Sequence, residues 1–194
     1  MMDLQTKYYL GILAIFLSFS IVPYIISILR NKTKPHAFSW LIWGISTLTI
    51  YFAQALSGAG AGSWSIGVSG VITIGVAILA YYKKSDDSIT KTDWICLIFA
   101  LLAIPFWYIT SSALYAVLIL TAIDLAGYWP TLRKSYHKPF EENITLFSIM
   151  TVRNLVSILA LETYSVTNIL FQSATMVANF IVIALVLLRR SSMK

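Results

Sequence analysis

Two charged side chains lie inside apolar stretches of this sequence, and they are the residues best placed to do chemistry. Asp124 lies about twelve residues into the stretch 113–132, and Arg153 lies about ten residues into the stretch 144–161. At ~1.5 Å per helical residue, both reach the middle of a ~30 Å hydrocarbon layer. An isolated charge at that depth costs at least ~2.5 kcal/mol, so we predict that the two side chains pair.

The predicted pair has two interpretations. It could be a static salt bridge that joins two consecutive helices. Alternatively, Asp124 accepts a proton or contacts a solute and competes for Arg153, in which case Asn154 and Ser157 line the same cavity wall. The sequence leaves both interpretations open.

Further polar residues lie at depth in the last apolar stretch. Gln172, Thr175 and Asn179 are spaced by three and four residues, so they share one face of a helix. We favour a polar central cavity over simple interhelical hydrogen bonds for this face. Thr73 lies 106 residues before Asn179. It belongs to a stripe of small residues, for which close helix packing is the favoured interpretation: Ser65, Ser69, Thr73 and Ala77.

Two prolines occur near the ends of apolar stretches, and a basic segment follows each of them. Because proline has no N–H, Pro23 frees the carbonyl of Phe19 and Pro130 frees that of Ala126. A static bend is one interpretation. The duplication favours a hinge, and Gly127 lies close to the second one. Trp40 and Trp43 could wall a path for a solute.

The composition identifies the elements that must position these residues. The 194-residue chain is 58% apolar and 11% charged, with a mean hydropathy of +0.79. A soluble domain averages about 25% charged residues. We therefore predict a multi-pass membrane protein, whose basic residues do not indicate nucleic-acid binding. The seven expected membrane helices cover residues 8–29, 38–56, 64–82, 94–109, 113–132, 144–161 and 166–188.

The basic residues predict the orientation. All of the 14 Lys and Arg residues except Lys7 and Arg153 fall in alternate loops or in the C-terminal tail. Because cytoplasmic loops carry the excess of Lys and Arg, we expect the N-terminus outside and the C-terminus in the cytoplasm. The expected location is the cell inner (plasma) membrane.

The chain also repeats itself. The segment "VPYIISILRNKTKP" from residue 22 resembles "WPTLRKSYHKP" from residue 129, and Pro23 and Pro130 are 107 residues apart. The basic pairs that begin at Lys83 and Arg189 are 106 residues apart. This predicts two parallel triple-helix bundles joined by a linker helix, a 3+1+3 arrangement. The expected units are residues 1–84, a linker with the fourth helix at 85–111, and residues 112–194.

These features resemble the SWEET and PQ-loop (MtN3-like) superfamily over nearly the whole chain, and the segment around residues 124–142 resembles small bacterial integral membrane proteins. In place of the Pro-Gln dipeptide the chain has Pro23-Tyr24 and Pro130-Thr131. The resemblance implies the 3+1+3 fold, an N-out and C-in topology, and a carrier of small solutes. It also implies that Thr73 and Asn179 are the paired polar positions that line the substrate site.

We therefore expect alternating-access transport of a small polar solute, of the sugar, amino acid or nucleoside class. The alternative is a non-transporting membrane receptor or accessory protein of the same fold. An enzyme is not expected, because the sequence has no cluster of metal ligands or nucleophile motif. No cofactor or metal is expected. The lipid bilayer and the solute are the expected partners, and the sequence leaves a homo-oligomer open.

Overall fold

The computed structural model describes residues 2–31, 35–83, 91–137, 139–142 and 144–193, apart from the side chains at 92, 93, 96, 130, 133, 134 and 141. The basic residues at 32, 34, 84, 138 and 194, which contributed to the expected orientation, lie outside the described part, as do the side chains of Arg133 and Lys134. The elements of the described part are helices, which confirms the expected all-helical class.

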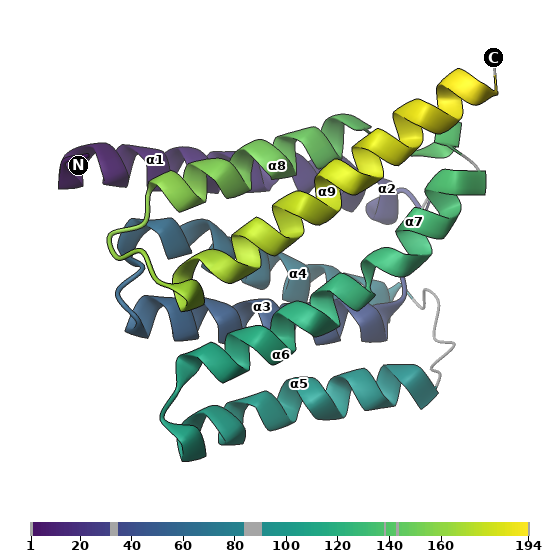
Figure 1. Ribbon diagram of the computed structural model, residues 1–194. Coiled ribbons are helices and arrows are strands. Elements are labelled where there is room, and N and C mark those ends of the chain that lie inside the picture. The colour runs from purple at the N-terminus through teal and green to yellow at the C-terminus, as the bar shows by residue number, and fades with distance from the viewer. Residues whose placement is uncertain (1, 32–34, 84–90, 138, 143, 194) are drawn as a thin grey trace.

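The chain forms a bundle of elongated helices, with its N-terminus and C-terminus at opposite ends (Figure 1). We call these the N-terminal end and the C-terminal end of the bundle. The α-helices are α1 (Leu4–Ser18), α2 (Val22–Leu29), α3 (Ala37–Leu56), α4 (Trp64–Tyr82), α5 (Lys91–Thr110), α6 (Ala113–Ala126), α7 (Tyr128–His137), α8 (Ile144–Leu159) and α9 (Val166–Ser192). Three short 3₁₀ helices are η1 (Phe19–Ile21), η2 (Gly60–Ser63) and η3 (Pro139–Glu141).

Local side chains define several helix ends. Asp3, His36 and Ser165 are the N-caps of α1, α3 and α9, and each side chain accepts a hydrogen bond from a backbone N–H three residues later. Such bonds satisfy donors that have no partner within the helix. Asn31 follows α2 with φ +57°, the left-handed conformation that commonly ends a helix and that asparagine tolerates.

Two of the expected membrane helices are interrupted near their prolines. The first passes from α1 through η1 into α2, where Pro23 is the second residue. Pro23 has no N–H to donate to the Phe19 carbonyl, which accepts a hydrogen bond from the Val22 N–H instead. The fifth is interrupted at Gly127, so α6 ends earlier than expected and α7 continues to His137.

The helices pack in a regular order. In the first part of the chain α4 lies between α1 and α3, and in the last part α9 lies between α6 and α8. Across the bundle α1 packs against α8, and α3 packs against α6. The helix α5 packs on the outside of this group, against α6 and α3 (Figure 1).

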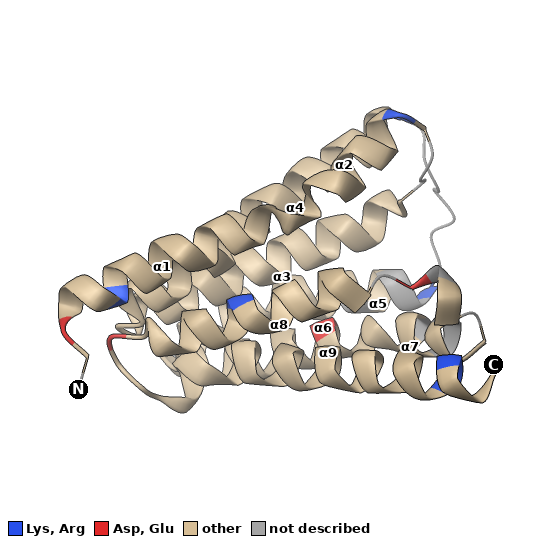
Figure 2. Ribbon diagram, turned by 90° about the horizontal axis from the view of Figure 1, so that it is seen from above, with Lys and Arg blue, Asp and Glu red and all other residues tan. Residues whose placement is uncertain are grey.

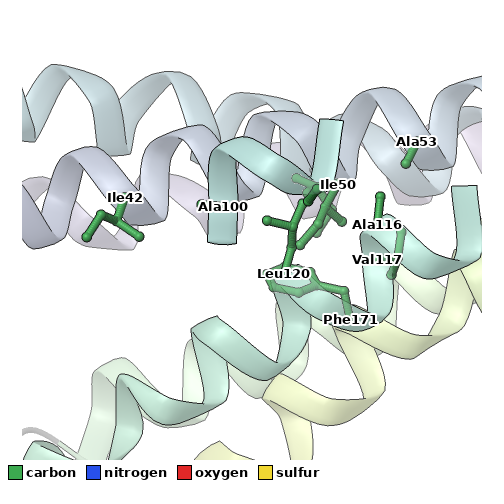
Figure 3. Packing of buried hydrophobic residues seen from close by; sticks show 10 residues of the cluster. Ile42, Ile50, Ala53, Ala100, Ala116, Val117, Leu120 and Phe171 are labelled. Carbon is green, nitrogen blue, oxygen red and sulfur yellow. The ribbon is translucent and has the colours of Figure 1, made fainter. Parts of the chain in front are cut away.

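The main apolar core lies where α5 and α6 meet α3 (Figure 3). Ile50 of α3 and Leu120 of α6 are fully buried, and Ala100 and Ala103 of α5 pack against the same cluster. Small residues on α5 and α6 let these helices approach closely. This core therefore holds α6, which carries Asp124, at a fixed place beside α3.

Three helical stretches of the described residues are long and apolar enough to cross a membrane: Leu4–Leu29, Gly60–Tyr82 and Val166–Ser192. Shorter apolar helices cover Leu97–Thr110, Ala113–Ala126 and Ile144–Leu159. Figure 2 shows charged residues at the two ends of the bundle, and two charged positions in its middle on α8 and α6. These two are Arg153 and Asp124.

Candidate functional site

A cavity of about 250 Å³ lies inside the bundle. Six residues that the sequence singled out as binding or coupling candidates line it: Thr73, Asp124, Arg153, Asn154, Thr175 and Asn179. They come from α4, α6, α8 and α9, and residues of α1, η1, α3 and α7 complete the walls. The fold therefore brings side chains that are up to 106 residues apart in the sequence to one polar cavity.

Arg153 is buried, and neighbouring neutral groups hold its guanidinium. One terminal nitrogen donates a 2.6 Å hydrogen bond to Ser69 Oγ, and the other donates a 2.6 Å bond to Asn154 Oδ1. Nε donates to the same Asn154 oxygen at 3.2 Å. A charged group that is removed from water needs such bonds. They fix the guanidinium between α4 and α8.

The structure corrects the prediction that Arg153 and Asp124 pair directly. Within the described part of the chain, no hydrogen bond or ion pair joins the Asp124 carboxylate to another side chain. The reason is the packing: α6 packs against α5, α9 and α3, whereas α8 packs against α9 and α1. The two charges therefore line one cavity without direct contact.

The neutral polar groups of the cavity bind one another. The Tyr128 hydroxyl donates a 2.9 Å hydrogen bond to Asn179 Oδ1, which joins the start of α7 to α9. Asn154 Nδ2 donates to Thr175 Oγ1 at 3.0 Å, which joins α8 to α9. Thr73 Oγ1 donates to the backbone carbonyl of its own helix. These neutral groups thus have hydrogen-bond partners within the protein, whereas the Asp124 carboxylate has no hydrogen-bond partner among the described residues.

Aromatic rings form one side of the cavity. Trp40 and Trp43 of α3 both line it, and their rings pack edge-to-face with centroids 5.7 Å apart. The lack of a side chain at Gly127 makes room for Trp43, because a Cβ there would lie 2.9 Å from the Trp43 ring. The Trp43 ring also lies with Asp124 and Tyr128 along a second hollow of about 220 Å³.

Gln172, the seventh candidate, does not line the cavity. Its amide exchanges two hydrogen bonds with the amide of Gln54 on α3, at 2.9 and 3.0 Å, and both side chains are fully buried. We call this the glutamine pair. It lies on the N-terminal side of the cavity, because Gln54 is near the end of α3 and Gln172 is near the start of α9.

The small-residue stripe of α4 has polar roles as well as a packing role. Ser65 Oγ forms a 2.6 Å hydrogen bond with Ser157 Oγ of α8, and both side chains are fully buried. Ser69 holds Arg153, and Thr73 lines the cavity. The favoured interpretation of this stripe as packing alone was therefore incomplete.

The N-terminal end of the bundle is closed by two turns that hydrogen bond to each other. One connects α3 to α4 and the other connects α8 to α9. The Glu162 N–H donates to the Ala59 carbonyl and the Thr163 N–H donates to the Gly58 carbonyl, each at 3.1 Å. Lys7 of α1 is buried beside them and donates to the Glu162 carbonyl at 3.4 Å. We call this contact the turn–turn closure.

The two candidate hinges occupy equivalent places. Ile21 and Tyr128 each lie two residues before a proline, at positions 107 apart, and both line the cavity. A change of the bend at Pro23 or Pro130 would therefore move a cavity wall directly. Tyr128 itself was missed by sequence reasoning, although it is four residues after Asp124 and hence on the same helical face.

The chain matches no protein-family model, no curated protein and no solved structure. The resemblance to the SWEET and PQ-loop superfamily therefore stays a prediction from the sequence. Any functional conclusion must come from the cavity and the surrounding helices.

Proposed function

We propose that this protein is a seven-span carrier that moves a small polar solute across the plasma membrane by alternating access. In this proposal α1–α2, α3 and α4 form the first triple-helix bundle, and α6–α7, α8 and α9 form the second. The helix α5 is the linker. The N-terminal end faces outward and the C-terminal end faces the cytoplasm.

The packing order supports the proposed duplication. In each unit the third helix (α4 or α9) lies between the first and the second helix. The first helix of one unit also packs against the second helix of the other, α1 against α8 and α6 against α3. This is the contact pattern of two parallel units related by a two-fold axis along the bundle. The interruptions of the first helix in each unit, at η1 and at Gly127, are also about 107 residues apart.

The outer surface supports a membrane location. Large apolar side chains are exposed along the bundle, as at Phe16 (69%), Val71 (64%) and Ile109 (77%). A soluble monomer rarely exposes so much contiguous apolar surface. A lipid environment would cover it, and the charged residues at the two ends would then lie at the membrane surfaces.

The cavity carries the functional proposal. Residues of both units line it, and one of them is a buried Arg153 at mid-bundle. On its N-terminal side the units are joined by the glutamine pair, the Ser65–Ser157 bond and the turn–turn closure. These contacts are hydrogen bonds, which can break and re-form as two units rock. A cavity at a repeat interface, closed on one side by reversible contacts, is the arrangement that alternating access needs.

Accessibility of the cavity from both sides would test this proposal. In a Cys96→Ser background, Ile72→Cys places a thiol in the cavity, and Val71→Cys places one on the exposed apolar face. A carrier should let membrane-impermeant methanethiosulfonate reagents modify Ile72→Cys in both right-side-out and inside-out vesicles. Val71→Cys, which faces lipid, should react in neither. Modification of Ile72→Cys from one side only would contradict alternating access.

Uptake into proteoliposomes would separate the carrier from the alternative receptor. A carrier should accumulate or exchange a labelled solute from a panel of sugars, amino acids and nucleosides. A protein that binds one of these solutes without flux would be the receptor.

A further inference from the structure

We infer that the cavity binds a small zwitterion, with the ammonium group at Asp124 and the carboxylate at Arg153. This inference rests on the proposed function and narrows its solute to one class. Its starting point is that both charges line one cavity without a direct contact between them.

Arg153 has hydrogen-bond capacity left for a carboxylate. A guanidinium carries five N–H donors. Three bonds to Asn154 and Ser69 leave two donors without a partner among the described residues. Asn154 and Ser69 supply neutral oxygens, so they hold the guanidinium without neutralising it. Two N–H donors match the two oxygens of a carboxylate, which arginine binds in a bidentate manner.

Asp124 has the complementary property. Its carboxylate accepts no hydrogen bond from the described part of the chain. The Tyr128 hydroxyl, four residues later in the chain, donates to Asn179 instead. An ammonium group offers three donors and a positive charge, so it satisfies this carboxylate. The Trp43 ring beside Asp124 adds an aromatic surface, which also attracts cations.

Other solute classes fit the cavity less well. A sugar needs many neutral hydrogen-bonding groups, whereas Tyr128, Asn179 and Thr175 already bind partners within the protein. Asp124 and Arg153 have opposite charges in one cavity, so a solute with a single charge would leave the occupied cavity with a net charge, which is costly away from water. A zwitterion compensates both and has no net charge.

The size and walls of the cavity point to a small zwitterion with an apolar portion. A volume of about 250 Å³ is below the ~300–1,000 Å³ of pockets that hold drug-sized ligands. Trp40, Phe147, Met150 and Phe171 contribute apolar wall. An amino acid with a short aliphatic side chain has this combination of charge, size and apolar surface.

Binding to the purified full-length protein in lipid nanodiscs would test the inference. The zwitterions are L-leucine, glycine and β-alanine, which vary the side chain and the distance between the charges. The matched controls are N-acetyl-L-leucine, which lacks the ammonium, and L-leucinamide, which lacks the carboxylate. Glucose and uridine represent the other classes. Titration calorimetry should detect at least one zwitterion. Capping either charge of L-leucine should weaken binding about 30-fold or more, because each cap leaves one buried charge unpaired.

Two variants assign the charges to their residues. Asp124→Asn should abolish the preference for L-leucine over N-acetyl-L-leucine and keep the preference over L-leucinamide. Arg153→Gln should abolish the preference for L-leucine over L-leucinamide and keep the preference over N-acetyl-L-leucine. If either variant fails to fold, the binding of the zwitterions and their capped forms to the unchanged protein still tests the inference. The inference is overturned if no zwitterion binds, if L-leucine and its capped forms bind equally, or if glucose or uridine binds more tightly.

The outcomes also separate this inference from the proposed function. Zwitterion binding that needs both charges, without uptake into proteoliposomes, would support the zwitterion site and contradict the carrier. Uptake of glucose or uridine without zwitterion binding would support the carrier and overturn the zwitterion site.

Discussion

Replacement of one glutamine of the glutamine pair should destabilise the protein more than replacement of both. Gln54→Met keeps the length of the side chain but removes both hydrogen bonds of the pair, at 2.9 and 3.0 Å, and a longer 3.4 Å bond from Gln54 Nε2 to the Thr167 carbonyl. It leaves the Gln172 amide fully buried without the bonds of the pair. Interhelical hydrogen bonds in membranes average ~0.6 kcal/mol, with a maximum of ~1.7 kcal/mol. Two such bonds, or one buried amide without a partner, give a cost of about 1–3 kcal/mol.

A double-mutant cycle measures this cost. The free energy of unfolding is determined for the purified protein in mixed micelles by titration with a denaturing detergent. Gln54→Met and Gln172→Met should each lose about 1–3 kcal/mol, whereas the double variant should lose much less than their sum, because no buried amide is left without a partner. Gln5→Met is the matched control, since Gln5 is exposed, and it should stay within about 0.5 kcal/mol. Strictly additive losses in the double variant would refute the reasoning.

The remaining predictions concern packing and a cavity bond. Gly62→Ala should lower the free energy of unfolding by about 1–3 kcal/mol, because its Cβ would lie 2.7 Å from the Ser157 carbonyl oxygen, a backbone atom that cannot rotate away. Gly75→Ala, with no atom within 4 Å of the new Cβ, should be neutral or stabilising by up to about 1 kcal/mol, and equal losses for the two would contradict this account. Tyr128→Phe should cost about 0.5–1.5 kcal/mol in the same assay, because Asn179 loses its donor; an unchanged stability would show that the bond contributes nothing.

The helices themselves could be predicted from the sequence, because each depends on local features. The long apolar stretches needed only their composition, and turns such as Ser57–Ser63 were marked by glycine and serine. For the same reason, the expected bounds 38–56 and 64–82 lie within one residue of the observed bounds of α3 and α4. The interruption lies at Gly127, beside which the sequence predicted the bend, because proline can occupy the first turn of a helix and the break then comes before it.

Most of the candidate residues that line the cavity could also be predicted from the sequence. Thr175 and Asn179 share a helical face by spacing alone, and the 106-residue offset connected Asn179 to Thr73. Depth along the apolar stretch placed Asp124 and Arg153 at the same level. These properties depend on one helix or on the repeat, so they needed no knowledge of which helices are neighbours.

Tertiary structure decided the partner of each polar group. Gln172 shares a face with Thr175, yet it binds Gln54, because α3 crosses α9 at that level. Arg153 binds Ser69 and Asn154 instead of Asp124, because α6 and α8, which belong to consecutive apolar stretches, are separated in the bundle by α9 and the cavity. Helical spacing fixes the direction of a side chain on its own helix, whereas a hydrogen bond also depends on the helix packed opposite, which only the folded bundle determines.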